Sequence, residues 1–332
     1  MDLALFFRRP GIFFSIEELF DTVATHLPTS INVKRLVAPR GGAGTTALLT
    51  NSRWARRNRA EVNHVTGDIH YVALALPGGQ TVLTVHDLRI LGSVFGIKKL
   101  LLKLLWFTLP VRHVARVTVV SESTRSELLR LVPVNRAKVQ VIPNCIPPCF
   151  VYTPREFNRD KPNVLQVGVT DNKNLTGLAR ALSGINCSLT ILGEPSSEHI
   201  RLLHENGIDF NWTSGLSLEG VVRLYQECDL VTFVSTHEGF GRPIIEGNAV
   251  GRPVITSCIS SMPEVAGDAA LLVDPFAVTE IRAAILAVIQ QRELRDTLVR
   301  KGQKNVERFS PGTIAATFAT LYDEVYRQNV AM

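Results

Sequence analysis

Two glutamates, Glu238 and Glu246, have seven residues between them, in a stretch that also contains Gly239 and Gly241. Carboxylates accept hydrogen bonds from hydroxyl groups, and the backbone N–H groups of a glycine loop or a helix start bind anions. If both glutamates face one crevice, they suit a ligand with phosphate groups and many hydroxyls, such as a nucleoside diphosphate sugar. Their spacing alone would also fit a solvated loop residue and a partner of a helix dipole.

The residues around this pair predict the elements that position it. Residues 230–234 form an apolar run, typical of a buried parallel strand. Pro243 suits the first turn of a helix, and Gly251 suits its end. Residues 254–255 begin the next strand. The unit is therefore strand, glycine loop, helix and strand, with the loop at the carboxyl ends of a parallel sheet, where open α/β folds bind ligands.

Residues 238–254 read Glu-Gly-Phe-Gly-Arg-Pro-Ile-Ile-Glu-Gly-Asn-Ala-Val-Gly-Arg-Pro-Val and resemble the E-x7-E signature of glycosyltransferase family 4. The resemblance covers residues 164–310 well and residues 1–145 more thinly. It implies the GT-B fold, with two Rossmann-like domains facing a cleft and a C-terminal helix crossing back to the first. The expected divisions are an acceptor-side domain, a nucleotide-sugar-binding domain and the returning helix, at residues 1–150, 151–310 and 311–332.

The resemblance also implies a function. We expect a retaining, metal-independent glycosyltransferase that moves a hexose-like sugar from a UDP-sugar, GDP-sugar or similar donor to a hydroxyl of a glycan or lipid-linked acceptor. Glu238 and His86 are the expected catalytic residues, with Glu238 on donor-sugar hydroxyls. His86 stands with Asp87 at a strand end, where the family often has His-Asp facing the donor sugar. Glu246 is expected to hold the ribose.

The diphosphate site departs from the family pattern. Lys173-Asn174-Leu175 resembles the family's Arg-Lys-Asn-Leu, but Asn172 replaces the arginine, so one of two cations is missing. Arg242 is the candidate for the second charge. Gly215 and Leu216 resemble the turn that brackets the nucleobase, and a glycine loop near Gly11 is a weaker match. The expected donor-binding set is therefore Lys173, Asn172, Gly239, Phe240, Gly241, Arg242, Glu246, Gly215, Leu216 and Gly11.

Two other functions fit features of this sequence. Residues Gly42 to Ala47 match the dinucleotide fingerprint G-x-G-x-x-A, which would suit an NAD-dependent Rossmann enzyme. Against it, the match follows the second expected strand, and Glu61 begins a strand where the ribose-binding acid should end one. The other alternative is a protein that binds a nucleotide sugar without turnover.

Composition limits the remaining classes. A chain of 332 residues with 45% hydrophobic content is long enough for two domains and too apolar to be disordered. Its net charge of +6 fits anionic ligands or an anionic membrane surface, and we expect no nucleic-acid partner. Five scattered cysteines without Cys-x-x-Cys predict a reduced, cytoplasmic protein. The histidines lack metal-ligand spacing and Asp-x-Asp is absent, so we expect no metal.

The segment from Val94 to Leu109 is a strongly apolar expected helix that contains three lysines: Lys98, Lys99 and Lys103. It is too short and too charged to span a membrane. One interpretation is a core helix whose lysines reach outward to water. The other is a helix lying in a membrane interface, with lysines at the headgroups and Trp106 and Phe107 below. The second would place the protein peripherally at the inner face of a membrane.

Overall fold

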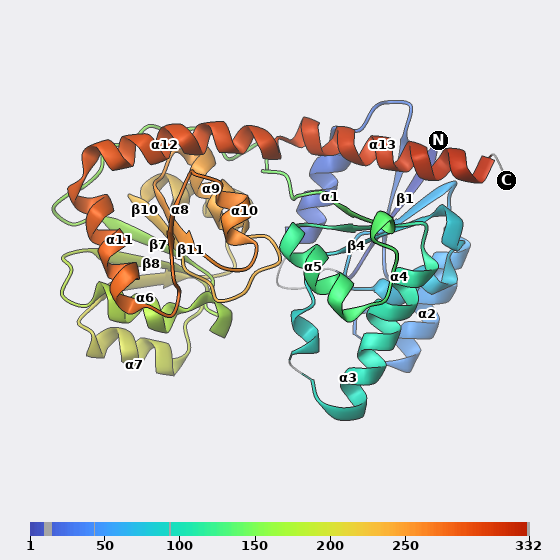
Figure 1. Cartoon of the computed structure of the whole chain (residues 1–332), viewed down its shortest axis with the longest axis horizontal. Helices are drawn as coiled ribbons and strands as arrows, with labels where there is room; N and C mark the ends of the chain where they lie inside the picture. The colour runs from blue at the N-terminus through green and yellow to red at the C-terminus, as the bar shows by residue number, and fades with distance from the viewer. Residues whose placement is uncertain (10–14, 43, 93, 331–332) are drawn as a thin grey trace. The chain divides into compact units, whose positions relative to one another are not determined.

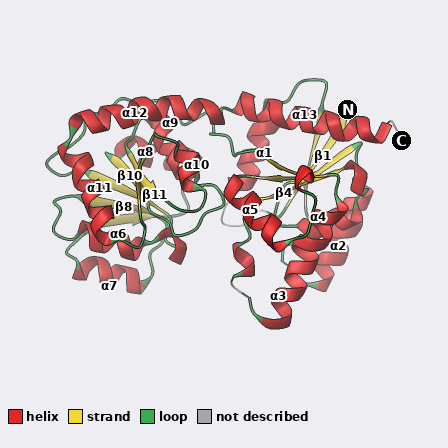
Figure 2. Ribbon diagram, viewed as in Figure 1, coloured by secondary structure: helices red, strands yellow, loops and turns green. Residues whose placement is uncertain are grey.

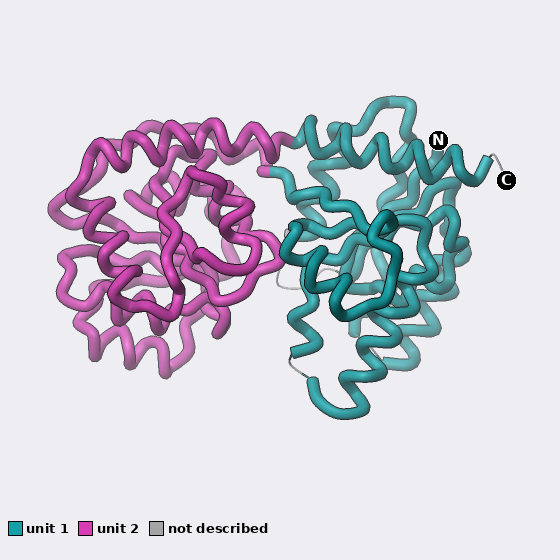
Figure 3. Tube along the Cα trace, viewed as in Figure 1, with its two compact units in different colours: residues 1–145, 311–332 teal, residues 146–310 magenta. Residues whose placement is uncertain are grey.

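The computed structural model describes residues 1–9, 15–42, 44–92 and 94–330, which form two compact units. The first unit contains residues 1–145 and 311–332, and the second contains residues 146–310 (Figure 3). Each unit is built on one six-stranded parallel sheet with helices around it (Figure 2). The predicted fold class, two Rossmann-like domains, is confirmed.

The first unit has the strand order β2-β1-β3-β4-β5-β6 (Figure 1). Its strands are β1 (Asp2–Phe7), β2 (Asn32–Val37), β3 (Val62–Val65), β4 (Thr81–Val85), β5 (Arg116–Val119) and β6 (Val139–Val141). Its α-helices are α1 (Ser15–Thr25), α2 (Thr45–Arg57), α3 (Gly96–Leu102), α4 (Leu109–His113), α5 (Glu122–Leu131) and α13 (Pro311–Val330). The shorter helices are η1 (His70–Ala75), η2 (Gly78–Gln80), η3 (Arg89–Leu91), η4 (Lys103–Thr108) and η5 (Arg136–Lys138).

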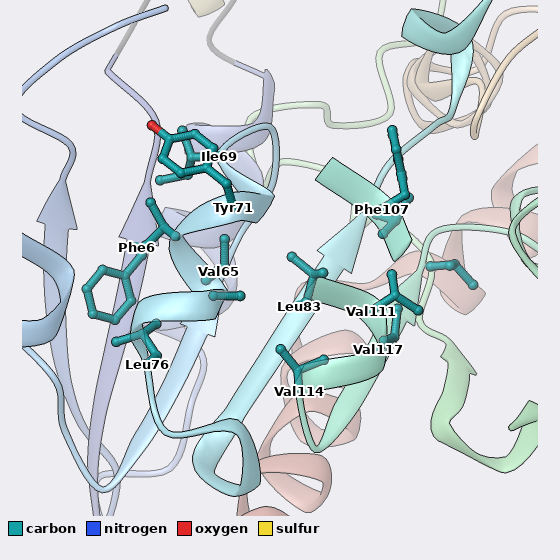
Figure 4. Packing of buried hydrophobic residues seen from close by; sticks show 14 of the residues in the cluster. Phe6, Val65, Ile69, Tyr71, Leu76, Leu83, Phe107, Val111, Val114 and Val117 are labelled. Carbon is teal, nitrogen blue, oxygen red and sulfur yellow. The ribbon is translucent and has the colours of Figure 1, made fainter. Parts of the chain in front are cut away.

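Alternate side chains of β1 supply the cores on the two faces of this sheet, as the strand period of two requires. Leu3, Leu5 and Phe7 pack with apolar residues of α1 and α13. Phe6 instead packs with Val65, Tyr71 and other residues of the opposite core (Figure 4). Both faces are covered, so the strand is apolar at every position after Asp2.

The C-terminal helix α13 belongs to the first unit, although it follows the second in sequence. It buries Ile314, Phe318, Tyr322 and Val325 in the core that contains β1 and α1. Its Tyr322 hydroxyl lies 2.7 Å from His64 Nδ1 on β3. The return of the last helix to the first domain is therefore confirmed.

The second unit has the strand order β12-β11-β10-β7-β8-β9. Its strands are β7 (Asn163–Val167), β8 (Ser188–Leu192), β9 (Asp209–Thr213), β10 (Leu230–Phe233), β11 (Val254–Ser257) and β12 (Leu271–Val273). Its helices are α6 (Leu175–Leu182), α7 (Ser197–Glu205), α8 (Leu218–Glu227), α9 (Arg242–Val250), α10 (Met262–Ala266), α11 (Val278–Gln290), α12 (Arg292–Val306), η6 (Asp171–Lys173) and η7 (Glu307–Phe309). Helix α9 has Pro243 in its first turn and ends at Gly251 with φ +78°, as predicted.

The expected single helix from Val94 to Leu109 is instead three successive pieces. α3 runs into η4, which is a π-helix, and η4 continues into α4. Phe107 does not face a membrane as the interfacial interpretation required, because its ring is 1% exposed in the core of the first unit. Among the described residues, no helix has the length and apolar character needed to cross a membrane.

A buried histidine predicts how acid affects the first unit. His64 bonds Tyr322 through Nδ1 and Thr84 through Nε2, both at 2.7 Å. Burial lowers the pKa of His64 to about 3, whereas a histidine in an unfolded chain titrates near 6.5. Between these values the unfolded chain binds a proton that the folded chain excludes. The contribution of His64 to stability is therefore complete above pH 6.5 and is lost as the pH falls toward 3.

Unfolding by urea between pH 7 and pH 5 measures this effect. Below pH 6.5 each such histidine contributes a slope of about 1.4 kcal/mol per pH unit to the unfolding free energy. We expect His64→Gln to reduce the slope of the wild type and the exposed control His26→Gln to keep it. A His64→Gln protein with the full wild-type slope would contradict the prediction.

Candidate active site

The second sheet changes direction between β7 and β10. From β7 the chain adds β8 and β9 on one side, and it then returns to add β10 on the other side of β7. The loops that follow β7 and β10 therefore leave neighbouring strands in opposite directions. Such a switch point opens a crevice at the carboxyl ends of the strands, where open α/β sheets bind ligands.

Lys173 and Glu238 meet at this switch point. Lys173 Nζ lies 2.6 Å from Glu238 Oε1, and both side chains are largely buried. Asn172 Nδ2 donates to the same Oε1 at 3.0 Å and to the His237 carbonyl, also at 3.0 Å. No residue that the structure describes binds Glu238 Oε2. The structure thus brings together three of the predicted residues, with one carboxylate oxygen available to a ligand.

The path of the Lys173 side chain depends on a glycine. Gly168, directly after β7, has φ +87°, and a Cβ there would lie 3.0 Å from Lys173 Cε. The Lys173 ammonium also lies 4.6 Å from the centre of the Phe233 ring, which is a cation–π distance. A Cβ at 168 would be strained by this φ and would require the lysine stem to shift by a few tenths of an ångström.

Asn174 is a residue whose importance sequence reasoning missed. It has φ +57°, and its side chain caps α6 by accepting from the Gly177 N–H at 3.2 Å. Its Nδ2 donates to the carbonyls of Val234, at 3.2 Å, and Pro275, at 2.7 Å. Asn174 therefore ties the loop after β7 to the chain after β10. An asparagine directly before a helix was the available signal.

Two serines fix the backbone of the glutamate loop. Ser260 Oγ donates to the Glu238 carbonyl at 2.7 Å and accepts from the Glu238 N–H at 3.1 Å. Ser261 Oγ donates to the Phe240 carbonyl at 2.8 Å. The Phe240 ring is buried edge-on against Phe309, 5.6 Å between centroids, so this side chain faces the core rather than a ligand.

Glu246 lies one turn into α9 and has a separate set of partners. Its Oε2 accepts from the Tyr225 hydroxyl at 2.6 Å, and its Oε1 lies 3.2 Å from Arg242 Nε. Burial, followed by the charge of Glu246, raises the pKa of Tyr225 well above its usual value, so the phenol remains a donor. Arg242, which the sequence suggested for the diphosphate, contacts Glu246 here. The tyrosine was not predicted from sequence.

The expected nucleobase turn lies at the same end of the sheet, beyond an outer strand. The Gly168 N–H donates to the Leu192 carbonyl, and the Gly193 N–H donates to the Thr213 carbonyl, both at 2.8 Å. These hydrogen bonds extend the parallel pairing of β7, β8 and β9 to their carboxyl ends, so the loops after the three strands leave the same edge of the sheet. Gly215 follows β9 with φ +68°, and Leu216 is exposed.

In the first unit, His86 follows β4. Its Nε2 lies 2.8 Å from the Thr66 carbonyl, which can only accept, so Nε2 carries the proton and Nδ1 is the ring's acceptor. Burial lowers the pKa of His86 and keeps the ring neutral. Gly11, the other candidate in this unit, lies outside the described residues.

A charged group close in the topology to His86 was not predicted. Arg8, directly after β1, pairs with Glu17 at 2.9 Å and with Asp68. Strands β1 and β3 flank the switch point of the first sheet, because β2 lies on the other side of β1. The basic pair Arg8-Arg9 at a strand end was the signal available in the sequence.

The loop for the NAD alternative is placed elsewhere. Gly42 and Gly44 lie between β2 and α2, and β2 is the edge strand of the sheet. A Cβ on either glycine would meet no atom within 4 Å. A dinucleotide fingerprint follows the first strand of the fold and has glycines packed closely against the helix or the ligand. The loop after β2 has neither feature.

Two family models match this chain. The model described as "Glycosyl transferases group 1" matches residues 153–305, and the model "Glycosyltransferase Family 4" matches residues 5–149. Together they cover nearly the whole sequence, and the chain belongs to glycosyltransferase family 4.

Curated relatives are similar over part of their length. The chain is 30% identical to the Escherichia coli O-antigen chain mannosyltransferase B over 212 residues, which is 58% of this chain and 56% of the relative. It is 27% identical to the MMP alpha-(1->4)-mannosyltransferase of Mycolicibacterium hassiacum over 227 residues, 64% of this chain and 55% of the relative. The alignments thus span little more than half of each of these relatives.

Solved structures show the same fold. A sucrose-phosphate synthase from Thermosynechococcus elongatus has a TM-score of 0.78 at 16% identity, covering 98% of this chain and 99% of its own. HepE from Anabaena, in complex with UDP and glucose, has a TM-score of 0.76 at 16% identity, covering 98% and 100%. WaaG, a glycosyltransferase involved in lipopolysaccharide biosynthesis, has a TM-score of 0.68 at 14% identity, covering 97% and 99%. The fold is GT-B.

The packing of α9 gives a prediction for the element that carries Glu246. A Cβ at Gly247 would lie 2.9 Å from Val254 Cγ2 and 3.0 Å from Val231 Cγ2, so Gly247→Ala must push the helix off the sheet. We expect a loss of roughly 1–3 kcal/mol of stability. Gly312→Ala on α13 is the matched control, because its Cβ meets no atom within 4 Å. Thermal unfolding that is unchanged in Gly247→Ala would contradict this packing.

Proposed function

We propose that this protein is a retaining glycosyltransferase that moves a sugar from a nucleoside diphosphate sugar to an acceptor hydroxyl. The observation that carries the proposal is Glu238 at the switch point of the second sheet. Its Oε1 is held by Lys173 and Asn172, and no described residue binds its Oε2. Family membership and the activities of the relatives support the reaction class.

Lys173 is proposed to bind the diphosphate while it stays in contact with Glu238. An ammonium group has three N–H donors, so one can remain on Glu238 Oε1 while others reach phosphate oxygens. Backbone groups of Gly239, Phe240 and Gly241 would add neutral donors. Because these groups are held before the ligand arrives, they stabilise the charge that builds on the diphosphate as the glycosidic bond breaks.

Glu238 Oε2 is proposed to accept from a donor-sugar hydroxyl, and Glu246 from the ribose. Tyr225 and Arg242 orient Glu246 through one oxygen each, so Arg242 acts on the donor through this carboxylate. Gly215 and Leu216 would bracket the base, and Asn172 serves the donor by positioning Glu238. His86, neutral and with Nδ1 as acceptor, is proposed to contact the sugar.

No covalent nucleophile is required if the acceptor hydroxyl attacks the face from which the diphosphate leaves. The bond from the anomeric carbon to the diphosphate breaks, the bond to the acceptor oxygen forms, and the hydroxyl proton passes to the departing phosphate. The product then keeps the donor's anomeric configuration. We propose a glycan or lipid-linked acceptor and a cytoplasmic, peripheral location at the inner face of a membrane.

A donor screen with Glu238→Gln tests the proposal. Wild-type protein is incubated with UDP- and GDP-sugars and candidate acceptors, and proton NMR reports both transfer and the configuration of the new bond. We expect retention and a loss on the order of 10²–10³ in rate for Glu238→Gln, because it removes one preorganised charge. Glu293→Gln, an exposed acid of α12, is the control and should keep full activity. An inverted product, or a fully active, folded Glu238→Gln, would overturn the assignment.

Chelation tests how the diphosphate charge is balanced. In the proposal Lys173 and backbone N–H groups provide this balance without a divalent cation. We expect the rate in excess EDTA to equal the untreated rate, and Lys173→Met to weaken the binding of nucleoside diphosphate in a thermal-shift titration. Loss of turnover in EDTA that Mg²⁺ or Mn²⁺ restores would contradict the prediction.

A further inference from the structure

Residues 94–109 have two apolar sides, and one of them anchors the segment to the first unit. Phe107 is buried in the core that also contains Val111 (Figure 4). Leu102 and Trp106 pack against the same core, and Trp106 Nε1 donates to the Asp68 carbonyl at 2.8 Å. These residues are thus engaged in contacts within the first unit, and Trp106 lies on the packed side of the segment rather than on its outward side.

The other side is exposed. Ile97, Leu100, Leu101 and Leu104 are 74%, 64%, 51% and 39% exposed, and Phe95 before them is 80% exposed. The four aliphatic positions have the spacing i, i+3, i+4 and i+7, which places them on one face of a helix. Figures 1 and 2 show α3 extending beyond the other helices of the first unit. A continuous exposed apolar stripe of this kind marks an interaction surface, whereas single exposed apolar residues do not.

Charge identifies the partner. Lys98 and Lys99 are exposed, Lys103 is half-buried, and the chain has no Asp or Glu between Asp87 and Glu122. A second copy of this segment would bring like charges together, which disfavours a dimer through this face. An apolar stripe flanked by lysines, with an aromatic ring at one end, has the features of helices that lie in the interface of an anionic bilayer.

We propose that residues 94–104, the basic apolar segment, bind the surface of an anionic lipid bilayer. Phe95 and the four aliphatic side chains enter the boundary between headgroups and acyl chains, and the lysines contact lipid phosphates. Trp106 and Phe107 remain packed against the core of the first unit and thereby connect the inserted segment to the rest of the protein. This membrane contact rests on the peripheral location proposed for the protein and names the segment responsible for it. It does not require the transfer reaction, so an experiment can show loss of vesicle binding without loss of turnover, or the reverse.

Co-sedimentation tests the proposal with vesicles of phosphatidylglycerol and phosphatidylcholine, against phosphatidylcholine alone, at about 0.1 M salt. We expect the wild type to pellet with the anionic vesicles only. Phe95→Ser/Leu100→Ser should stay in the supernatant, and Phe276→Ser should pellet like the wild type. Phe276 is the matched control because its ring is 72% exposed on the second unit.

A second pair of variants separates local from net charge. Each lysine near an anionic surface is worth roughly a fivefold change in binding, so Lys98→Gln/Lys99→Gln/Lys103→Gln should lose on the order of a hundredfold. The control Arg53→Gln/Arg56→Gln/Arg57→Gln removes three exposed charges from α2 and should bind like the wild type. Circular dichroism checks that each variant is folded.

Three results would overturn the proposal. One is folded wild-type protein that stays in the supernatant with anionic vesicles. Another is equal loss in the lysine and arginine variants, which would show that net charge alone determines binding. The third is a dimer in sedimentation velocity that Phe95→Ser/Leu100→Ser converts to a monomer while vesicle binding is absent, which would assign the surface to a second copy.

Discussion

The contact between Lys173 and Glu238 determines much of the arrangement around it. Removing either partner would leave an uncompensated charge in a largely buried place, which is far more costly than losing a solvated surface pair. The neighbouring residues serve to keep the two groups together. Gly168 leaves space for the lysine stem, Asn174 ties the two loops, and Ser260 fixes the glutamate backbone. A site held this way needs little reorganisation when a ligand arrives, which is the condition for strong electrostatic stabilisation.

A second ion pair, Arg242 with Glu246, is also held by a neighbouring side chain, which here is the phenol of Tyr225. Tyr225 lies beneath Glu246 and cannot ionise at physiological pH, because burial and the neighbouring carboxylate both raise its pKa. The carboxylate therefore accepts a hydrogen bond from the neutral Tyr225 phenol and forms an ion pair with Arg242. The second cation in this region, Arg242, is thus engaged with a carboxylate, as Lys173 is.

In the first unit, a buried network of hydrogen bonds holds separate elements together, as the ion pair of Lys173 and Glu238 does in the second unit. Tyr322 bonds His64, His64 bonds Thr84, and Thr84 lies 2.6 Å from Thr118. The network links α13 to β3, β4 and β5 through groups that would be costly to bury without partners. It gives the last helix one register on the sheet, whereas the surrounding apolar contacts with Phe318 and Val325 would tolerate small shifts.

The sequence by itself determined the local units. The apolar runs before the glycine loops, Pro243 at a helix start and Gly251 at its end are local signals, because strand burial and helix termini depend on neighbouring residues. The strand, loop and helix around Glu238 and Glu246 were therefore predictable. So was the α/β class of the whole chain, and the E-x7-E pattern indicated the family.

Only the tertiary structure decided which of these residues meet. Lys173 and Glu238 are 65 positions apart and come together because β10 returns to the side of β7. The same arrangement brings Asn172, which stands in the place of a family arginine, within hydrogen-bond distance of Glu238. The Phe240 ring in the glutamate loop packs against Phe309 in the core. For residues 94–109 the sequence left open whether the helix packs in the core or lies in a membrane interface. Packing against Val111 buried Phe107 and left Ile97 and Leu100 exposed, since periodicity defines the faces of a helix but not which face the protein covers.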